Sequence, residues 1–81
     1  MKIRIKLFAV AQQLAGQAEV EIELNEGADI AALRNALLAA YPQMKNIAAQ
    51  LTFAVDTEYA KDSTPITADA EVAVIPPVSG G

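Results

Sequence analysis

The chain has 81 residues, of which 53% are hydrophobic, a net charge of −4, and neither Cys nor His. So short a chain forms one small domain, because it cannot build two independent cores. The missing Cys and His exclude disulfides, thiol chemistry, zinc sites and a Ser–His nucleophile, and the acidic balance argues against non-specific nucleic-acid binding.

The first predicted element is a β-strand at residues 2–8, where polar and apolar side chains alternate. Ile3, Ile5 and Leu7 share its inward face, and by the same parity Phe8 lies on the outward face. The basic start mimics a signal peptide, but its apolar run is shorter than the usual central region of about 7–15 residues. No apolar stretch approaches the roughly 18 residues of a membrane span, so we expect a soluble, cytoplasmic protein.

A short helix at residues 9–15 and a second strand at residues 19–24 follow. Gly16 is well placed to end the helix, because glycine readily adopts the left-handed conformation. Glutamates alternate with apolar residues in the second strand, so its outward face is acidic whereas that of the first strand is basic. Opposite charges on neighbouring strands attract. The two strands are therefore predicted to be antiparallel neighbours in a hairpin-like unit.

The main helix is predicted to begin after Asp29, which can cap it, and to end at Pro42. Its apolar side chains recur at the spacing of one helical face: Ile30, Leu33, Leu37, Leu38 and Tyr41. This stripe should cover the sheet, and Arg34 lies off it. Residues 43–50 are expected to form an irregular connection or a loose turn of helix.

The second half of the chain predicts three more strands, at residues 51–55, at the short edge segment 58–61 and at residues 71–75. Turn-forming residues separate them. The order of strands and helices predicts an α+β fold of the β-grasp type, a mixed sheet packed against one main helix, although periodicity alone also allows other small α+β layouts. We expect the domain to span residues 1–75 and an extended, flexible tail to span residues 76–81.

The tail is the strongest candidate for a functional segment. It reads Pro76-Pro77-Val78-Ser79-Gly80-Gly81, and its two prolines favour a stiff, extended exit from the last strand. At about 3.3 Å per residue, six residues reach roughly 20 Å. The small residues at the tip could thread a narrow channel in a partner's active site, where the Gly81 carboxylate would be the reacting group. An ordinary frayed terminus is the alternative.

Three apolar residues are candidates for a docking surface near the tail: Phe8, Tyr59 and Ile75. Parity places Phe8 and Ile75 on the outward faces of their strands. A cluster of exposed apolar side chains indicates a binding surface, although single exposed hydrophobic residues are ordinary. No paired acids, metal-ligand cluster or phosphate-binding loop is evident, so no metal is expected and an acid–base site is not favoured.

The tail and three other segments resemble one family. These segments are Leu7-Phe8-Ala9, the helix core Ala32-Leu33-Arg34 and the strand Phe53-Ala54-Val55-Asp56. Together they are similar to the small, sulfur-carrying subunits of molybdopterin synthase (MoaD-type), which belong to the ubiquitin-like β-grasp group. The resemblance covers nearly the whole chain, and Pro-Pro-Val-Ser-Gly-Gly is its most specific element.

The resemblance implies a concrete activity. An activating enzyme of the ubiquitin-E1-like type would use MgATP to adenylate the Gly81 carboxylate. Sulfur, ultimately from a cysteine desulfurase, would then displace AMP to give a C-terminal thiocarboxylate. The tail would insert into the large catalytic subunit of a heterotetramer and give its sulfur to cyclic pyranopterin monophosphate, building the dithiolene of molybdopterin. The chain itself would bind no cofactor and would not be catalytic, and Phe8, Tyr59 and Ile75 would contact the large subunit.

Other functions fit the same sequence. The nearest is a ThiS-like sulfur carrier for thiamine thiazole synthesis, which shares the Gly-Gly end and the fold. A ubiquitin-like modifier would instead be joined through Gly81 to lysines of target proteins. A plain interaction domain would make no use of its terminal glycines.

Overall fold

The computed structural model describes residues 1–76, and residues 77–81 lie outside the described part. Within residues 1–76 the chain forms one mixed sheet with the strand order β2-β1-β5-β3-β4, two α-helices and one 3₁₀ helix. The strands are β1 (Lys2–Leu7), β2 (Glu19–Glu23), β3 (Thr52–Val55), β4 (Glu58–Ala60) and β5 (Val72–Ile75). The helices are α1 (Ala9–Ala15), α2 (Ile30–Ala40) and the 3₁₀ helix η1 (Pro42–Gln50). Both helices and all five strands were predicted within a residue or two at each end.

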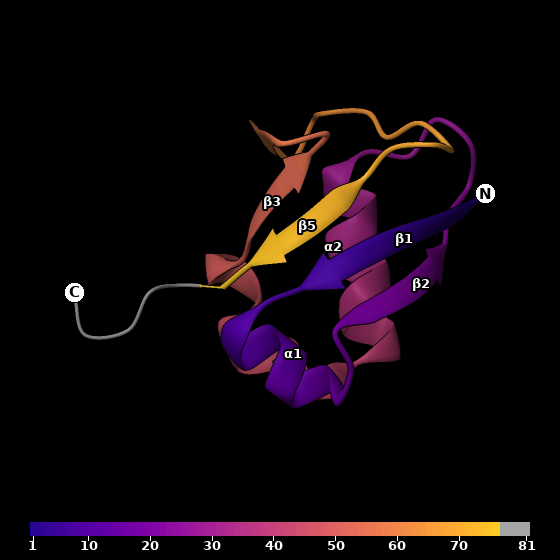
Figure 1. Cartoon of the computed structure of the whole chain (residues 1–81). Helices are drawn as coiled ribbons and strands as arrows, with labels where there is room; N and C mark the ends of the chain where they lie inside the picture. Colours follow the sequence, from indigo (N-terminus) through magenta and orange to yellow (C-terminus); the bar gives the residue numbers. More distant parts are fainter. Residues whose placement is uncertain (77–81) are drawn as a thin grey trace.

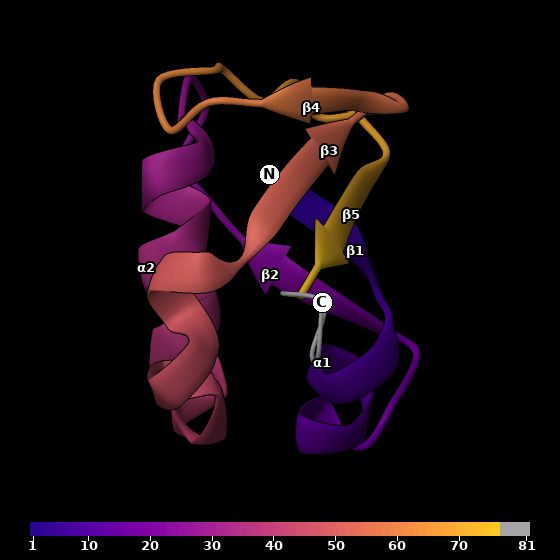
Figure 2. The same cartoon turned by 90° about the vertical axis from the view of Figure 1, so that its left-hand side faces the viewer.

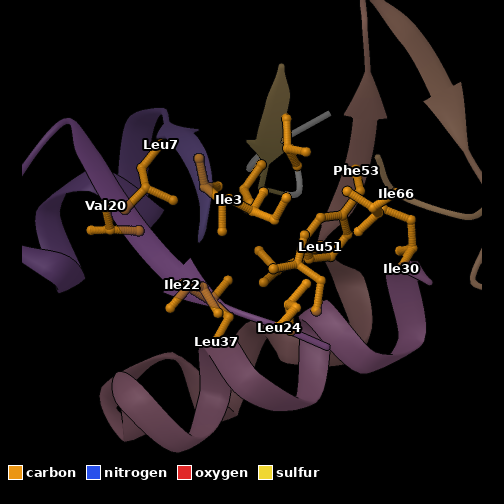
Figure 3. Close-up of a cluster of buried hydrophobic side chains, with 14 of the residues drawn as sticks. Ile3, Leu7, Val20, Ile22, Leu24, Ile30, Leu37, Leu51, Phe53 and Ile66 are labelled. Carbon is orange, nitrogen blue, oxygen red and sulfur yellow. The ribbon is translucent and has the colours of Figure 1, made fainter. Parts of the chain in front are cut away.

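The core lies between α2 and one face of the sheet. Figures 1 and 2 show α2 running along one side of the strands, so that the opposite side, here called the open face, is not covered by it. Figure 3 shows side chains from the strands and from α2 meeting in one cluster. The buried cluster consists of Ile3, Ile5, Leu7, Ala11, Val20, Ile22, Leu24, Ile30, Leu33, Leu37, Met44, Leu51, Phe53, Ile66, Ala70, Val72 and Val74. Strand parity therefore sorts core from surface as the sequence predicts.

The charged faces of β1 and β2 meet as expected. The strands pair antiparallel, with Lys2 opposite Glu23, Arg4 opposite Glu21 and Lys6 opposite Glu19. The ion pairs are nevertheless diagonal, because Arg4 Nε lies 3.1 Å from Glu19 Oε1. Lys6 turns the other way, and its Nζ lies 3.6 Å from Glu71 Oε1. These exposed pairs contribute at most about 1 kcal/mol each. They therefore favour this pairing of the strands but add little to the stability of the fold.

The start of α2 is closed by backbone and side-chain acceptors. Asp29 caps it as predicted, its Oδ1 accepting from the N–H of Ala32 at 3.0 Å. The N–H groups of Ile30 and Ala31 donate to carbonyls in the segment 62–64, each at 3.0 Å. The first helical N–H groups, which helices usually leave unpaired, are therefore satisfied within the protein.

The region after α2 is more regular than the sequence indicates. Residues 42–50 form the 3₁₀ helix η1, so of the two expected alternatives the helical turn is correct and the irregular connection is not. Runs of this length are uncommon for 3₁₀ helices, whose hydrogen-bond geometry is poorer than that of α-helices. Arg34 supports its end, since Nη1 donates to the carbonyl of Ala48 at 2.6 Å and to that of Leu51 at 3.0 Å. This long-range support explains why local sequence did not decide between the two alternatives.

The two-residue turn between β3 and β4 carries backbone strain. Asp56 and Thr57 have φ values of +50° and +71°, as the hairpin turns that favour Asn-Gly require. A β-branched residue such as Thr57 is disfavoured in this left-handed region. Asp56 is also tied to the chain before β5, because its N–H donates to the Glu71 carbonyl at 2.8 Å and its Oδ1 accepts from the Glu71 N–H at 2.9 Å.

Thr57→Gly is expected to raise the free energy of unfolding by about 0.5–1 kcal/mol, because glycine removes the steric cost of the positive φ. Urea denaturation of the purified protein measures this change. Ser63→Gly is the matched control, since Ser63 is exposed in a turn without a positive φ, and there the added chain entropy should leave stability unchanged or lower. Equal effects of the two substitutions would show that the turn is not strained.

Candidate functional site

The tail leaves the fold from the middle of the sheet. β5 lies between β1 and β3, parallel to β1 and antiparallel to β3. Figure 1 shows β5 beside β1, with both strands ending at the same end of the sheet. Of the predicted tail, Pro76 is described and buried, whereas Pro77, Val78, Ser79, Gly80 and Gly81 lie outside the described residues. The root of the tail is thus fixed by two hydrogen-bonded neighbours.

Two of the candidate docking residues lie together at this root. Leu7 pairs with Val74, so the residues that follow them, Phe8 and Ile75, continue the two parallel strands side by side. Phe8 is 48% exposed and Ile75 is partly buried. Phe8 follows the buried Leu7 in an extended conformation, and Ile75 lies between the buried Val74 and Pro76, so both face the open side of the sheet. The structure thus brings Phe8 and Ile75 to the tail's point of exit.

The third candidate, Tyr59, lies farther along the open face. It is 79% exposed and pairs with Ala54, which in turn pairs with Ala73 of β5. Two strand spacings of about 4.8 Å separate Tyr59 from β5, and the small side chain of Ala54 occupies the position between Tyr59 and Ala73. Phe8, Ala54, Tyr59, Ala73 and Ile75 form what we call the apolar half of the open face. Phe8 and Tyr59 are the large hydrophobic residues that the described part of the chain exposes.

The other half of the open face is charged. A groove of about 480 Å³ lies over β1 and β2 and beside the start of β5. Its lining includes Lys2, Arg4, Lys6, Glu19, Glu21, Asp69 and Glu71. The acids and bases alternate and are partly paired with each other, and no group of acidic residues among residues 1–76 could hold a metal ion. This groove has the character of a solvated sheet surface rather than a catalytic centre, and the tail leaves from the opposite end of β5.

Arg34 is the residue whose importance sequence reasoning missed. It lies off the apolar stripe of α2 as predicted, yet its side chain is only 21% exposed. Its guanidinium bonds two carbonyls, pairs with Asp62 at 3.0 Å and lies 4.9 Å from the centroid of the Phe53 ring. The sequence did contain one indication of this role, a single arginine between apolar positions of the helix. Such a side chain needs hydrogen-bond partners when it is buried.

Comparisons with known proteins agree with this geometry. The model of the ThiS family matches residues 5–81. The molybdopterin synthase sulfur carrier subunit of Caenorhabditis elegans is 37% identical to this chain over 83 aligned residues, which cover 100% of this chain and 99% of the relative. That of Chlamydomonas reinhardtii is 35% identical over 83 aligned residues, which cover 100% of both chains. A putative molybdopterin converting factor subunit 1 from Pyrococcus furiosus has a TM-score of 0.85 at 31% identity, covering 96% of this chain and 99% of that one.

The fold and the tail root define a ubiquitin-like β-grasp protein. In this fold a mixed sheet packs against one main helix, and the last strand lies in the middle of the sheet. The chain belongs to the ThiS family, and within it to the molybdopterin synthase sulfur carrier subunits. No helix within residues 1–76 is both long and apolar enough to cross a membrane.

Proposed function

We propose that this chain is the sulfur carrier of molybdenum cofactor biosynthesis and that the carboxylate of Gly81 is its working group. An E1-like activating enzyme transfers AMP from MgATP to this carboxylate and releases pyrophosphate. Hydrosulfide, or a donor persulfide whose S–S bond a thiol then reduces, attacks the acyl carbon and displaces AMP, which leaves a thiocarboxylate at Gly81. In the cytoplasm, the tail that carries the thiocarboxylate enters the large subunit of molybdopterin synthase, with which the chain forms a heterotetramer. There the tail gives its sulfur to cyclic pyranopterin monophosphate.

The observation that carries the proposal is the position of the tail root. A carrier must present a reactive end to two different enzymes while its folded body stays intact. β5 meets this need, because it is paired with β1 through Val74 and with β3 through Ile75, and the tail follows at that end of the strand. Tethering a reactive group to a docked domain raises its effective concentration at the partner's reacting centre.

The chemistry of the described residues is consistent with this role. With no Cys in the chain, sulfur cannot be held as a persulfide, and the acidic residues of the open face are paired with bases or exposed. Adenylation converts a carboxylate, which is a poor electrophile, into an activated acyl group. The catalytic groups for both steps are therefore expected on the partner enzymes.

The test is to co-produce the chain with its activating enzyme and a sulfur source and to measure its intact mass. The expected result is a mass gain that corresponds to one oxygen replaced by sulfur, located at Gly81 by fragmentation. Adding the large subunit and cyclic pyranopterin monophosphate should then reverse the gain and yield molybdopterin. An unchanged mass under conditions that charge a known carrier would contradict the proposal, and so would conjugation of Gly81 to lysines of other proteins.

Phe8→Ala is expected to weaken binding to the large subunit about 30-fold, because truncation of a buried aromatic anchor at an interface typically costs about 2 kcal/mol. Calorimetric titration measures the affinity. The melting temperature should change little, since Phe8 is 48% exposed in the free protein. Gln13→Ala, at an exposed position of α1, is the control and should bind normally. An unaltered affinity of the Phe8 variant would place the interface elsewhere.

A further inference from the structure

The sheet stops abruptly at the residue before Pro76. Ile75 is paired with Thr52, the first residue of β3, and Val74 is paired with Leu7, the last residue of β1. Continuing these registers by one position would place Leu51 beside Pro76 on one side, and Phe8 beside Ile75, the residue just before Pro76, on the other. Both neighbouring strands therefore end where the tail begins.

The backbone groups at those neighbouring positions are already occupied. The N–H of Leu51 donates to the Ala48 carbonyl at 3.3 Å, and the Leu51 carbonyl accepts from Arg34 Nη1 at 3.0 Å. On the other side, the Phe8 carbonyl accepts from the N–H groups of Ala11 and Gln12 at 3.1 and 3.4 Å. A residue after Ile75 that carried an N–H would therefore have to share a carbonyl that already accepts another hydrogen bond, and a buried unpaired N–H is costly.

Pro76 fits this position because it has no N–H to pair. It is also buried, and it continues the alternation of β5, in which Val72 and Val74 are buried whereas Ala73 and Ile75 are partly exposed. Parity thus turns Pro76 toward the core side of the sheet. Pro76 is therefore a buried residue that lies beyond the last paired residue of β5.

We propose that Pro76 is a positioning residue, the fixed origin from which residues 77–81 reach the partner's reacting centre. This inference rests on the proposed function. It also sets a length, because five residues at about 3.3 Å each span no more than roughly 17 Å from Pro76. The proposal thus gives Pro76 a role in anchoring the tail and predicts no such role for Pro77.

The test compares Pro76→Ala, Pro76→Val and Pro77→Ala in steady-state adenylation by the activating enzyme. Pro76→Ala, which removes most of the buried ring, should raise the KM for the carrier about fivefold at unchanged kcat, because a loosened origin lowers the effective concentration of the terminus. Pro76→Val keeps a buried apolar side chain but adds the N–H that proline lacks, so its effect should fall between those of Pro76→Ala and the parent, whereas Pro77→Ala should stay within about twofold of the parent. Equal effects at the two prolines, or a larger one at Pro77, would overturn the proposal.

A measurement on the unaltered protein guards against a variant that does not fold. The Cα–Hα order parameter of Pro76 itself should equal that of Val74, at about 0.85, if Pro76 is anchored in the domain, and a value below about 0.6 would refute the anchor. This result does not depend on sulfur chemistry. If the unaltered chain is not adenylated at all, the proposed function fails, whereas the anchor is still decided by the order parameter.

Discussion

Deleting Gly81 is expected to abolish formation of the thiocarboxylate while leaving the melting temperature within about 1 °C of the parent value, since terminal residues outside the packed core contribute little to stability. The deletion shortens the reach from Pro76 by one residue and places the carboxylate on Gly80. The reacting carbon then falls short of the adenylating site by about 3.3 Å, and near-attack distances tolerate far smaller errors. Intact-mass measurement after co-production with the activating enzyme checks the loss.

Gly81→Ala separates the effect of tail length from the effect of a side chain on the terminal residue. It keeps the length of the tail and adds only one methyl group beside the carboxylate, which hinders the close backbone approach that glycine permits. We expect this variant to form the thiocarboxylate measurably but more slowly than the parent. A Gly81 deletion that acquires sulfur as fast as the parent would show that the length of the tail is not required, and one that unfolds the domain would show that the tail is structural.

Arg34→Met is expected to lower the free energy of unfolding by about 2–3 kcal/mol, because two carbonyls lose a charged donor and one short helix loses its support. For a domain of this size, that corresponds to a fall in melting temperature of roughly 10–20 °C. The affected carbonyls are those of Ala48 and Leu51, at the end of η1 and before β3. Methionine retains much of the apolar stem that packs near Phe53, so the loss reports mainly on the hydrogen bonds.

Asp62→Ala is the matched control for this prediction. Asp62 pairs with the same guanidinium at 3.0 Å, but its side chain is 65% exposed, so its removal should cost less than about 1 kcal/mol. Arg34→Lys should fall between the two, because one ammonium cannot reproduce the planar fork that reaches two carbonyls. If Arg34→Met and Asp62→Ala destabilise equally, the surface ion pair rather than the carbonyl contacts accounts for the effect.

Local patterns were sufficient for most of the fold. Alternation identified β1 and β2, and their opposite charges predicted the antiparallel pairing that the register confirms. The capping role of Asp29 and the stop at Gly16, whose φ is +77°, also followed from short-range chemistry. These features depend on residues within a few positions of each other, which is the range over which sequence patterns are informative.

Features that depend on distant contacts were not predictable. The central place of β5 requires a parallel pairing with β1 across some 65 residues of intervening chain, and no local pattern encodes it. The carbonyl contacts of Arg34 likewise join α2 to segments 14 and 17 residues away. At the candidate site, parity placed Phe8 and Ile75 correctly on the open face, whereas the burial of Pro76 emerged only from the arrangement of three strands.

The parallel pairing of β1 with β5 has a mechanical consequence. Figure 1 places the N-terminus at the start of β1, and the described chain ends beyond β5 at the other end of the sheet. A pull on the two ends therefore loads the rungs between Ile5 and Val72, Lys6 and Ala73, and Leu7 and Val74 in shear, all at once, instead of opening them one by one. A carrier drawn out of a partner's channel by its tail would thus resist unravelling, and it could be released intact and used again.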